Sequence, residues 1–256
     1  MTAALLPEGY RRRSFDTTPS TSAEAFAAAR AGEDGGIWIT AGEQTAGRGR
    51  HGRRWTTGRG NLAASLLLID PAPAEVVATV SFVGAVALHR AAAEVTGVAS
   101  SQRLAVKWPN DVLLDRRKVA GILVEGERLA DGRLAVAIGF GVNCVSHPDI
   151  VGQQAATSFA AAGLTVAAEA LFVTLAARLA EEIARWEHGR AFAVIRAAWL
   201  DRAAGVGAPI AVNMTDRAVD GVFETLDESG RLIVRRTDGT RTAVSAGDVF
   251  FATAAG

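Results

Sequence analysis

The chain has 256 residues and a formal net charge of zero, with 27 basic against 27 acidic side chains, and 49% of its residues are hydrophobic. This composition supplies a sizeable core, suits one medium domain plus a small one, and excludes an intrinsically disordered chain. The balanced charge disfavours generic nucleic-acid binding, and the single cysteine, Cys144, excludes a disulfide framework and any zinc cluster.

Residues 1–13 look like a loose lead-in that ends in the charged run Arg11 to Arg13. They contain no apolar core ahead of a small-residue cleavage site, so we find no secretory signal. The longest uncharged helical run, 76–89, is too short to span a bilayer. We therefore expect a soluble, cytoplasmic protein without a DNA-binding helix-turn-helix pair before Ser14.

Thr21 is predicted to cap the N-terminus of a first helix that ends before Gly32, because Thr21 and Glu24 have the spacing of a capping box. That account of Thr21 is purely structural. The functional alternative is that Ser20, Thr21 and Ser22 present hydroxyls and free N–H groups at a helix N-terminus, where a polar ligand binds.

A loop rich in arginine and glycine, residues 43–61, joins a predicted strand at 37–41 to a predicted strand at 62–69. It holds five arginines and five glycines but only one carboxylate, Glu43. Glycine lets backbone N–H groups approach a ligand, and arginine offers planar donors to carboxylate and phosphate oxygens. We interpret the segment as an anion-binding loop held by strands at both ends. The alternative is a solvated, arginine-rich surface loop.

Two common phosphate motifs do not account for this loop. Gly47-x-Gly49-x-x-Gly52 has the spacing of the dinucleotide fingerprint, but turn-forming residues follow where that fingerprint requires a helix. A P-loop is excluded because Arg53 and Arg54 stand where lysine and serine or threonine are needed.

A second informative stretch, 105–125, follows a predicted helix at 75–97. Lys107, Asn110 and Asp111 flank its Trp-Pro pair, and a predicted hairpin turn at 115–117 aims Lys118 from the returning strand. The alternative for Lys118 is an edge lysine that deters aggregation. Gly121 inside an apolar strand indicates close approach of a ligand or another backbone.

The remaining elements complete the predicted fold. A strand at 134–142 ends at Asn143, which is either a ligand or a turn residue, and helices follow at about 165–186 and 190–203. After a linker at 201–209 come five short strands with glycine turns between 210 and 252, which suggest a small SH3-like barrel. We therefore predict a larger domain at 1–206 and a C-terminal domain at 207–256.

Three stretches together resemble the biotin protein ligase family: Ser20 to Ser22, Gln44 to Trp55 with its AGRGRHGR core, and KWPNDVLLDRRKVAGILVE from Lys107 to Glu125. The resemblance covers about 14–256. It implies an α+β fold, with a mixed β-sheet flanked by helices like that of class II aminoacyl-tRNA synthetases, plus a small C-terminal SH3-like β-barrel. It departs from the family at Ser22, where asparagine is usual, and at His51, where many relatives have arginine. The first departure leaves a direct ligand role for Ser22 open.

The resemblance also implies a reaction and its residues. Biotin's carboxylate attacks the α-phosphate of ATP-Mg²⁺, and a lysine of a biotin carboxyl carrier domain then takes the biotinyl group. Catalytic roles fall to Arg48, Arg50, Lys118 and Asp111. Biotin would contact Ser20, Thr21, Ser22, Gln44, Gly47, Arg48, Gly49, Arg50, Lys118 and Gly121. The nucleotide would contact Arg53, Trp55, Lys107, Asn110 and Asn143, and Mg²⁺ would contact Asp111 and Asn110.

Two other functions remain as alternatives. A lipoate-type protein ligase uses related activation chemistry, but neither the Gly-Arg-Gly-Arg loop nor KWPND belongs to that pattern. A nucleic-acid-binding protein would bind phosphates with the arginines and bases with the small barrel. The neutral net charge and the lack of an aromatic cluster near the loop argue against this alternative. We expect no DNA binding and no membrane association, and a homodimer is an open alternative.

Overall fold

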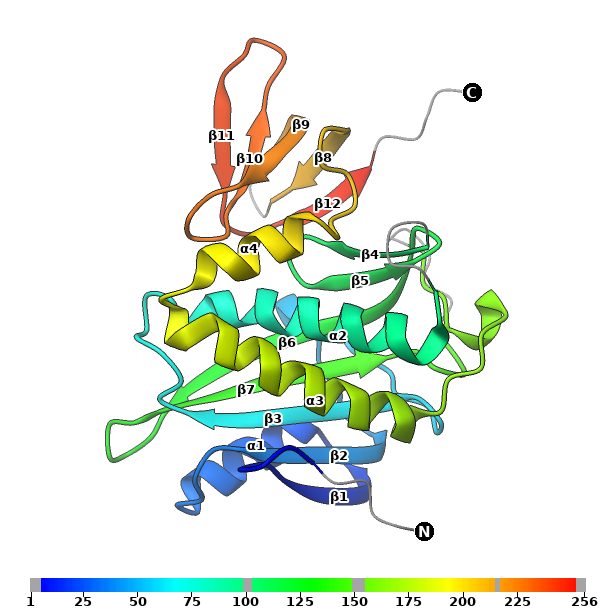
Figure 1. Ribbon diagram of the computed structural model, residues 1–256, viewed down its shortest axis with the longest axis vertical. Helices are drawn as coiled ribbons and strands as arrows, with labels where there is room; N and C mark the ends of the chain where they lie inside the picture. Colours follow the sequence, from blue (N-terminus) through cyan, green and yellow to red (C-terminus); the bar gives the residue numbers. More distant parts are fainter. Residues whose placement is uncertain (1–5, 99–102, 149–154, 215–216, 252–256) are drawn as a thin grey trace.

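A seven-stranded mixed sheet forms the centre of the molecule. The computed structural model describes residues 6–98, 103–148, 155–214 and 217–251. The strands of this sheet are β1 (Arg11–Thr18), β2 (Ile37–Gln44), β3 (Leu62–Ile69), β4 (Leu104–Lys107), β5 (Asp111–Leu114), β6 (Arg117–Arg128) and β7 (Leu134–Val142). They lie in the order β1-β2-β3-β7-β6-β5-β4 (Figure 1). β1 runs parallel to β2, and every other neighbouring pair is antiparallel.

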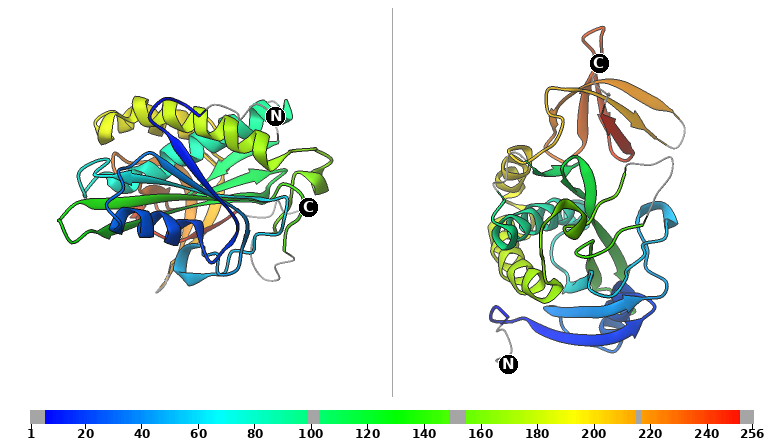
Figure 2. Two further views of the ribbon diagram at one scale, coloured as in Figure 1. Left: turned by 90° about the horizontal axis from the view of Figure 1, so that it is seen from below. Right: turned by 90° about the vertical axis from the view of Figure 1, so that its right-hand side faces the viewer.

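Helices cover both faces of this sheet. α2 (Val80–Thr96) and α3 (Ala168–Trp186) pack on one face and α1 (Thr21–Arg30) on the other, as the view from below in Figure 2 shows. Successive side chains of a strand point to opposite faces of the sheet, so β2 contributes to the hydrophobic core on each face. Ile37 and Ile39 pack on the α1 side, whereas Trp38 packs on the α2–α3 side. The predicted mixed sheet flanked by helices is confirmed.

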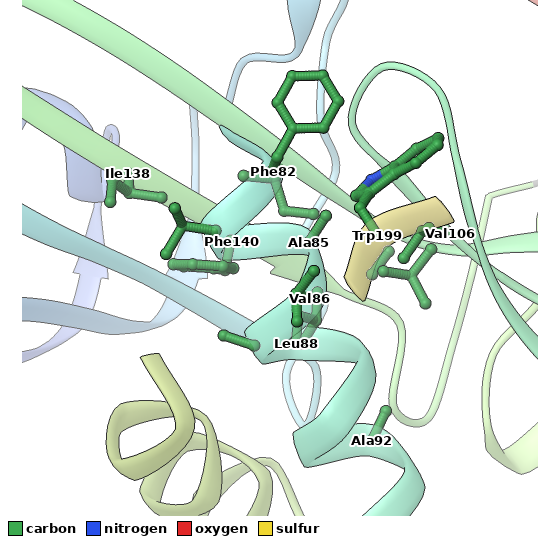
Figure 3. Close-up of a cluster of buried hydrophobic side chains, with 14 of the residues drawn as sticks. Phe82, Ala85, Val86, Leu88, Ala92, Val106, Ile138, Phe140 and Trp199 are labelled. Carbon is green, nitrogen blue, oxygen red and sulfur yellow. The ribbon is translucent and has the colours of Figure 1, made fainter. Parts of the chain in front are cut away.

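α2 is the helix around which the main core forms. Between Val80 and His89 it carries no charged residue, so it can be buried on all sides. Figure 3 shows its buried side chains between those of β7 and of α4 (Phe192–Leu200). The Phe82 ring meets the Trp199 ring edge-on, with centroids 5.6 Å apart. This packing holds α4 and the β4 end of the sheet against the same helix, α2.

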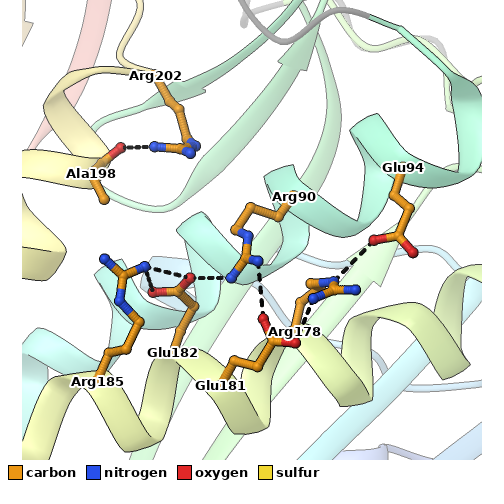
Figure 4. A network of polar contacts seen from close by, with 8 residues as sticks. All are labelled: Arg90, Glu94, Arg178, Glu181, Glu182, Arg185, Ala198 and Arg202. Carbon is orange, nitrogen blue, oxygen red and sulfur yellow. Dashed lines mark hydrogen bonds and ion pairs between the residues drawn. The ribbon is translucent and has the colours of Figure 1, made fainter.

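Ion pairs tie α2 to α3 along their outer side (Figure 4). The carboxylate of Glu182 is fully buried and pairs with Arg90 of α2 and Arg185 of α3. Arg90 also lies 2.9 Å from Glu181. A buried carboxylate without such partners would be costly, so these pairs fix how the two helices pack together.

A second, five-stranded antiparallel sheet follows α4. Its strands are β8 (Pro209–Asn213), β9 (Ala218–Leu226), β10 (Leu232–Arg235), β11 (Arg241–Val244) and β12 (Asp248–Phe251). They lie in the order β11-β10-β9-β8-β12, and no pairing within the described residues joins β11 to β12. The five predicted strands are confirmed, although residue 252 of the last predicted strand lies outside the described residues. A closed barrel is not seen there.

The second sheet packs directly on the first domain. The indole N–H of Trp108, next to Lys107, donates to the carbonyl of Gly230 at 3.0 Å. An added Cβ at Gly230 would lie only 2.6 Å from the Phe82 ring, so the β9–β10 turn contacts the core without a side chain. The small sheet is therefore anchored at the Trp-Pro segment that the sequence analysis singled out.

Two local predictions were wrong. Residues 11–13, which were predicted to be lead-in, begin the edge strand β1 (Arg11–Thr18), whose Arg12 guanidinium lies 4.3 Å above the Phe172 ring. The strand was not predicted because its arginines break the apolar alternation on which strand prediction relies. The N-cap of α1 is Ser20, whose hydroxyl accepts from the Ala23 N–H at 3.4 Å, and Thr21 is the first helical residue.

Candidate active site

One pocket gathers elements from both domains. Its walls are the N-terminus of α1, the arginine loop, the β4–β5 turn, the middle of β6, the end of β7 and the start of β12. Every candidate residue except Gly47 lines this pocket. The lining candidates are Ser20, Thr21, Ser22, Gln44, Arg48, Gly49, Arg50, Arg53, Trp55, Lys107, Asn110, Asp111, Lys118, Gly121 and Asn143.

Hydroxyl and amide groups form the end of the pocket beside α1. The N–H of Thr21 donates to Gln44 Oε1 at 2.9 Å, and the Thr21 hydroxyl lies 2.7 Å from the Ser65 hydroxyl. The Ser22 hydroxyl lies 3.2 Å from the same Ser65 oxygen. Rotatable hydroxyls at a helix N-terminus suit a neutral polar group or an anion.

The arginine loop folds back on itself as a short flap, residues 47–55. The Trp55 N–H donates to the Gly47 carbonyl at 2.9 Å, and the Gly49 N–H donates to the Arg53 carbonyl at 2.7 Å. His51 and Gly52 turn the chain at its tip with φ of 56° and 70°. The flap is thus held by its own backbone hydrogen bonds, and its residues 48–50 and 53–55 line the pocket.

Gly47 lies at the hinge of the flap, behind the pocket wall. A Cβ at this position would lie 2.5 Å from the Trp55 carbonyl oxygen and 3.0 Å from Gln44 Nε2. The first distance is shorter than real Cβ contacts and the second is tight, so glycine is required here by space and not by its φ angle. Any larger residue would displace the flap or Gln44.

Trp55 packs closely on the sheet because two glycines lie next to its ring. Gly121 of β6 and Gly141 of β7 are directly paired in the ladder. A Cβ on Gly141 would lie 2.3 Å from the indole nitrogen of Trp55. Lys118 Nζ lies 5.5 Å from the centroid of the indole, within range of a cation–π contact. The glycine pair therefore forms a flat floor for one aromatic plane.

Positive charge converges on the middle of the pocket. Lys118 Nζ lies 2.6 Å from Asp111 Oδ1, and both side chains are mostly buried. Burial lowers the pKa of the nearby Lys107, and the charge of Asp111 opposes that shift. Burial also lowers the pKa of Arg50, against the charges of Asp248 and Asp111. Closely spaced cations of this kind would stabilise phosphate oxygens.

Asn143 presents an acceptor to the pocket. Its side chain is 2% exposed, and its amide nitrogen donates to the Thr157 carbonyl at 3.0 Å. Its Oδ1 has no hydrogen-bond partner among the described residues. A buried unpaired carbonyl oxygen is costly, so a ligand N–H would be favourable at this point.

Comparisons with known proteins show which family this chain is similar to. Residues 15–143 match the model of the biotin/lipoate A/B protein ligase family, and residues 206–252 match that of the biotin protein ligase C-terminal domain. A biotin–[acetyl-CoA-carboxylase] ligase of Paracoccus denitrificans is 44% identical over 91% of this chain and 98% of its own length.

The chain belongs to the biotin/lipoate A/B protein ligase family.

Other members of this family support the assignment. A biotin–[acetyl-CoA-carboxylase] ligase of Mycobacterium tuberculosis is 31% identical over 91% of this chain and 85% of its own length. The solved structure of the Aquifex aeolicus biotin protein ligase with biotin and ATP has a TM-score of 0.78. It is 22% identical, and the match covers 94% of this chain and 99% of that one. That structure shares the fold of this family member.

Three pocket residues of this ligase-family chain escaped the sequence analysis. Ser65 lies in an apolar strand, and Gly141 is one of several glycines near the end of β7. Asp248 lies almost 200 positions from the flap residues that it meets. Only the alternating glycines 139 and 141 gave a signal in the sequence, because they indicate close approach.

Proposed function

We propose that the chain is a biotin protein ligase that activates biotin with ATP and transfers it to a lysine of a biotin carboxyl carrier domain. In the first step, an oxygen of biotin's carboxylate bonds to the α-phosphorus of ATP, and the bond to pyrophosphate breaks. In the second step, the lysine amine attacks the carbonyl of biotinyl-5′-AMP, loses a proton and releases AMP. The single observation that carries the proposal is the pocket that combines a hydroxyl–amide end with a group of cations.

The two ends of the pocket support separate roles. The hydroxyls of Thr21 and Ser22, with Gln44, suit the uncharged polar ring of biotin, and Ser20 fixes the helix end that holds them. Gly121 lets Lys118 and Trp55 lie close to β6, and the carboxylate would lie beside Lys118.

The cations address the central difficulty of the reaction, which is that a carboxylate must approach a polyphosphate. Arg48, Arg50 and Lys118 would screen this repulsion and stabilise charge on the pentavalent phosphorus. One preorganised donor supplies about 2.7–4 kcal/mol to a charged transition state. The substrates provide the nucleophile, so positioning and charge suffice.

The nucleotide end is supported by three side chains. Asn143 Oδ1 offers an acceptor that matches an exocyclic amino group such as that of adenine. The indole of Trp55 provides a plane for stacking, and Lys107 lies close enough to reach phosphate oxygens. A mixed anhydride hydrolyses readily, so the flap must exclude water once the adenylate has formed.

Magnesium fits as a companion of the nucleotide. Within the described residues, no group of three or more His, Cys, Asp or Glu side chains could hold a metal ion alone. Asp111 and the Oδ1 of Asn110 would hold the ion, and phosphate oxygens and water would supply its other ligands. The bound ion would neutralise phosphate charge.

Lipoate is the second candidate substrate, because the matching family model includes lipoate ligases. The experiment that tests the proposal compares the two acids. Purified protein receives ATP-Mg²⁺ with either biotin or lipoate, and pyrophosphate release is measured, followed by transfer to a biotin carboxyl carrier domain. We expect release and transfer with biotin. Preference for lipoate, or no transfer, would refute the proposal.

Several finer features belong to the same proposal. We propose a relation of the larger sheet to class II aminoacyl-tRNA synthetases, an open SH3-like form for the small sheet, and a domain boundary between residues 206 and 207. No helix in the described part of the chain is long and apolar enough to cross a membrane. A cytoplasmic location and the absence of DNA binding stay predictions, and a gel shift with duplex DNA tests the second. Homodimerisation stays open, and sedimentation at several concentrations tests it.

A further inference from the structure

The start of β12 belongs to the wall of the active-site pocket, although it lies in the C-terminal sheet. Asp248, Val249 and Phe250 line the pocket together with the flap. Lys107 Nζ lies 5.8 Å above the Phe250 ring. The C-terminal sheet therefore forms part of the pocket wall and does not contact only the outer surface of the first domain.

Two contacts join β12 to the flap. The carboxylate of Asp248 forms an ion pair with the guanidinium of Arg53. The guanidinium of Arg50 donates to the carbonyl of Gly247 at 3.3 Å. We call these four residues the latch. Within the described residues, no other carboxylate forms an ion pair with an arginine of the flap.

The position of Asp248 is fixed by its sheet. Asp248 pairs with Asn213 of β8, and a Cβ on Gly247 would lie 2.8 Å from Val212 and 3.0 Å from the Asn213 carbonyl. The backbone before Asp248 is therefore pressed against β8. An ion pair costs less entropy when one partner is already held, so the rigid strand can order the flap.

Charge favours the same contact. Burial raises the pKa of Asp248, but the hydrogen bond and charge of Arg53, with the charges of Arg50 and Lys107, outweigh it and lower the pKa. The carboxylate is thus ionised at neutral pH. It also offsets the mutual repulsion of the arginines, which otherwise favours an open flap.

We propose that Asp248 is a positioning residue of the ligase, which holds the arginine flap closed over the pocket through Arg53. The C-terminal sheet thereby controls how long the activated acid is shielded from water. The second statement rests on the proposed function, whereas the closure of the flap does not.

Limited trypsin digestion tests the latch directly, because trypsin cleaves after the arginines of the flap. Asp248→Asn keeps the shape and removes the charge. The side chains of Arg53 and Asp248 are 47% and 31% exposed, so solvent screens the pair and the effect is moderate. Without ligands, we expect the rate of flap cleavage to be about two- to fivefold higher in the variant than in the wild type. This ratio corresponds to about 0.4–1 kcal/mol in the free energy of flap opening, at 1.4 kcal/mol per tenfold.

Three further variants distinguish loss of the latch from a general loss of stability. Asp220→Asn removes an exposed carboxylate from β9 of the same sheet, away from the pocket, and should be cleaved like the wild type. Asp248→Glu should restore much of the protection. Arg53→Gln should reproduce the effect of Asp248→Asn at the remaining flap arginines, and the double variant should add nothing further.

The outcomes decide between explanations. Wild-type cleavage rates in Asp248→Asn would overturn the proposal, as would faster cleavage at Arg231 and Arg241, because that pattern means loss of the C-terminal sheet. In a second measurement, enzyme-bound biotinyl-AMP should be lost about two- to fivefold faster from Asp248→Asn, at unchanged KM for biotin. A wild type that shows the cleavage pattern but forms no adenylate would refute the proposed function and leave the latch standing.

Discussion

The glycine floor under Trp55 allows a graded test of how the flap positions substrates. Gly141→Ala would put a Cβ 2.3 Å from the indole of Trp55, whereas ordinary contact begins at 3.4 Å. The flap can move and the paired strands cannot, so the indole should retreat by about 1 Å. It would then lose the cation–π contact with Lys118, about 0.5–1 kcal/mol, and its stacking on the base, about 1–3 kcal/mol.

Together these losses convert to a fall of about 10- to 1000-fold in kcat/KM for adenylate formation, at 1.36 kcal/mol per tenfold. Two matched substitutions on β6 complete the series. At Gly121 a Cβ meets Lys118 at 3.3 Å and Trp55 at 3.4 Å, so Gly121→Ala should have a smaller effect. At Gly126 its nearest neighbour is Leu134 at 3.6 Å, so Gly126→Ala should behave like the wild type.

The assay is pyrophosphate release at varied biotin and ATP, with the thermal unfolding midpoint of each variant as a check on folding. We expect the three midpoints to differ little, because alanine is no worse than glycine in a strand. If Gly141→Ala kept the kcat/KM of the wild type, the indole would not be held on the glycine floor during the reaction, and this reasoning would fail.

Three more predictions follow from the site. Arg50→Ala and Lys118→Ala should each lower adenylate formation by about 10²- to 10³-fold, whereas the exposed Arg117→Ala should not; normal pyrophosphate release by either variant contradicts the assignment. Gly47→Ser should displace the flap and speed the release of biotinyl-AMP in a filter assay, and unchanged retention counts against that hinge. Burial raises the pKa of the Cys144 thiol from 9.0 to about 11. The thiol therefore ionises at lower pH in the unfolded chain than in the folded one. The free energy of unfolding should fall between these two pH values by up to about 2.7 kcal/mol, at 1.36 kcal/mol per pKa unit. In urea unfolding, Cys144→Ala should lack this loss, and an equal pH slope in the variant and the wild type would refute the prediction.

Local sequence pattern was sufficient wherever burial alone decides the structure. The strands at 62–69 and 134–142 were predicted with the bounds that the structure has, because continuous apolar runs of that length suit a strand buried on both faces. The arginine flap and the segment 107–125 were identified because glycine, arginine and the Trp-Pro pair have meanings that do not depend on distant neighbours.

Pairing between distant segments was decided only by the tertiary structure. The sequence does not say that Gly121 faces Gly141, since that depends on the register between β6 and β7. It does not bring Asp248 to Arg53, because the C-terminal sheet must first dock on Trp108. An arginine-rich edge strand such as β1 is likewise stabilised by hydrogen bonds to a neighbour and not by its own apolar pattern. Composition and periodicity encode which residues are buried, whereas register and docking determine which of them meet.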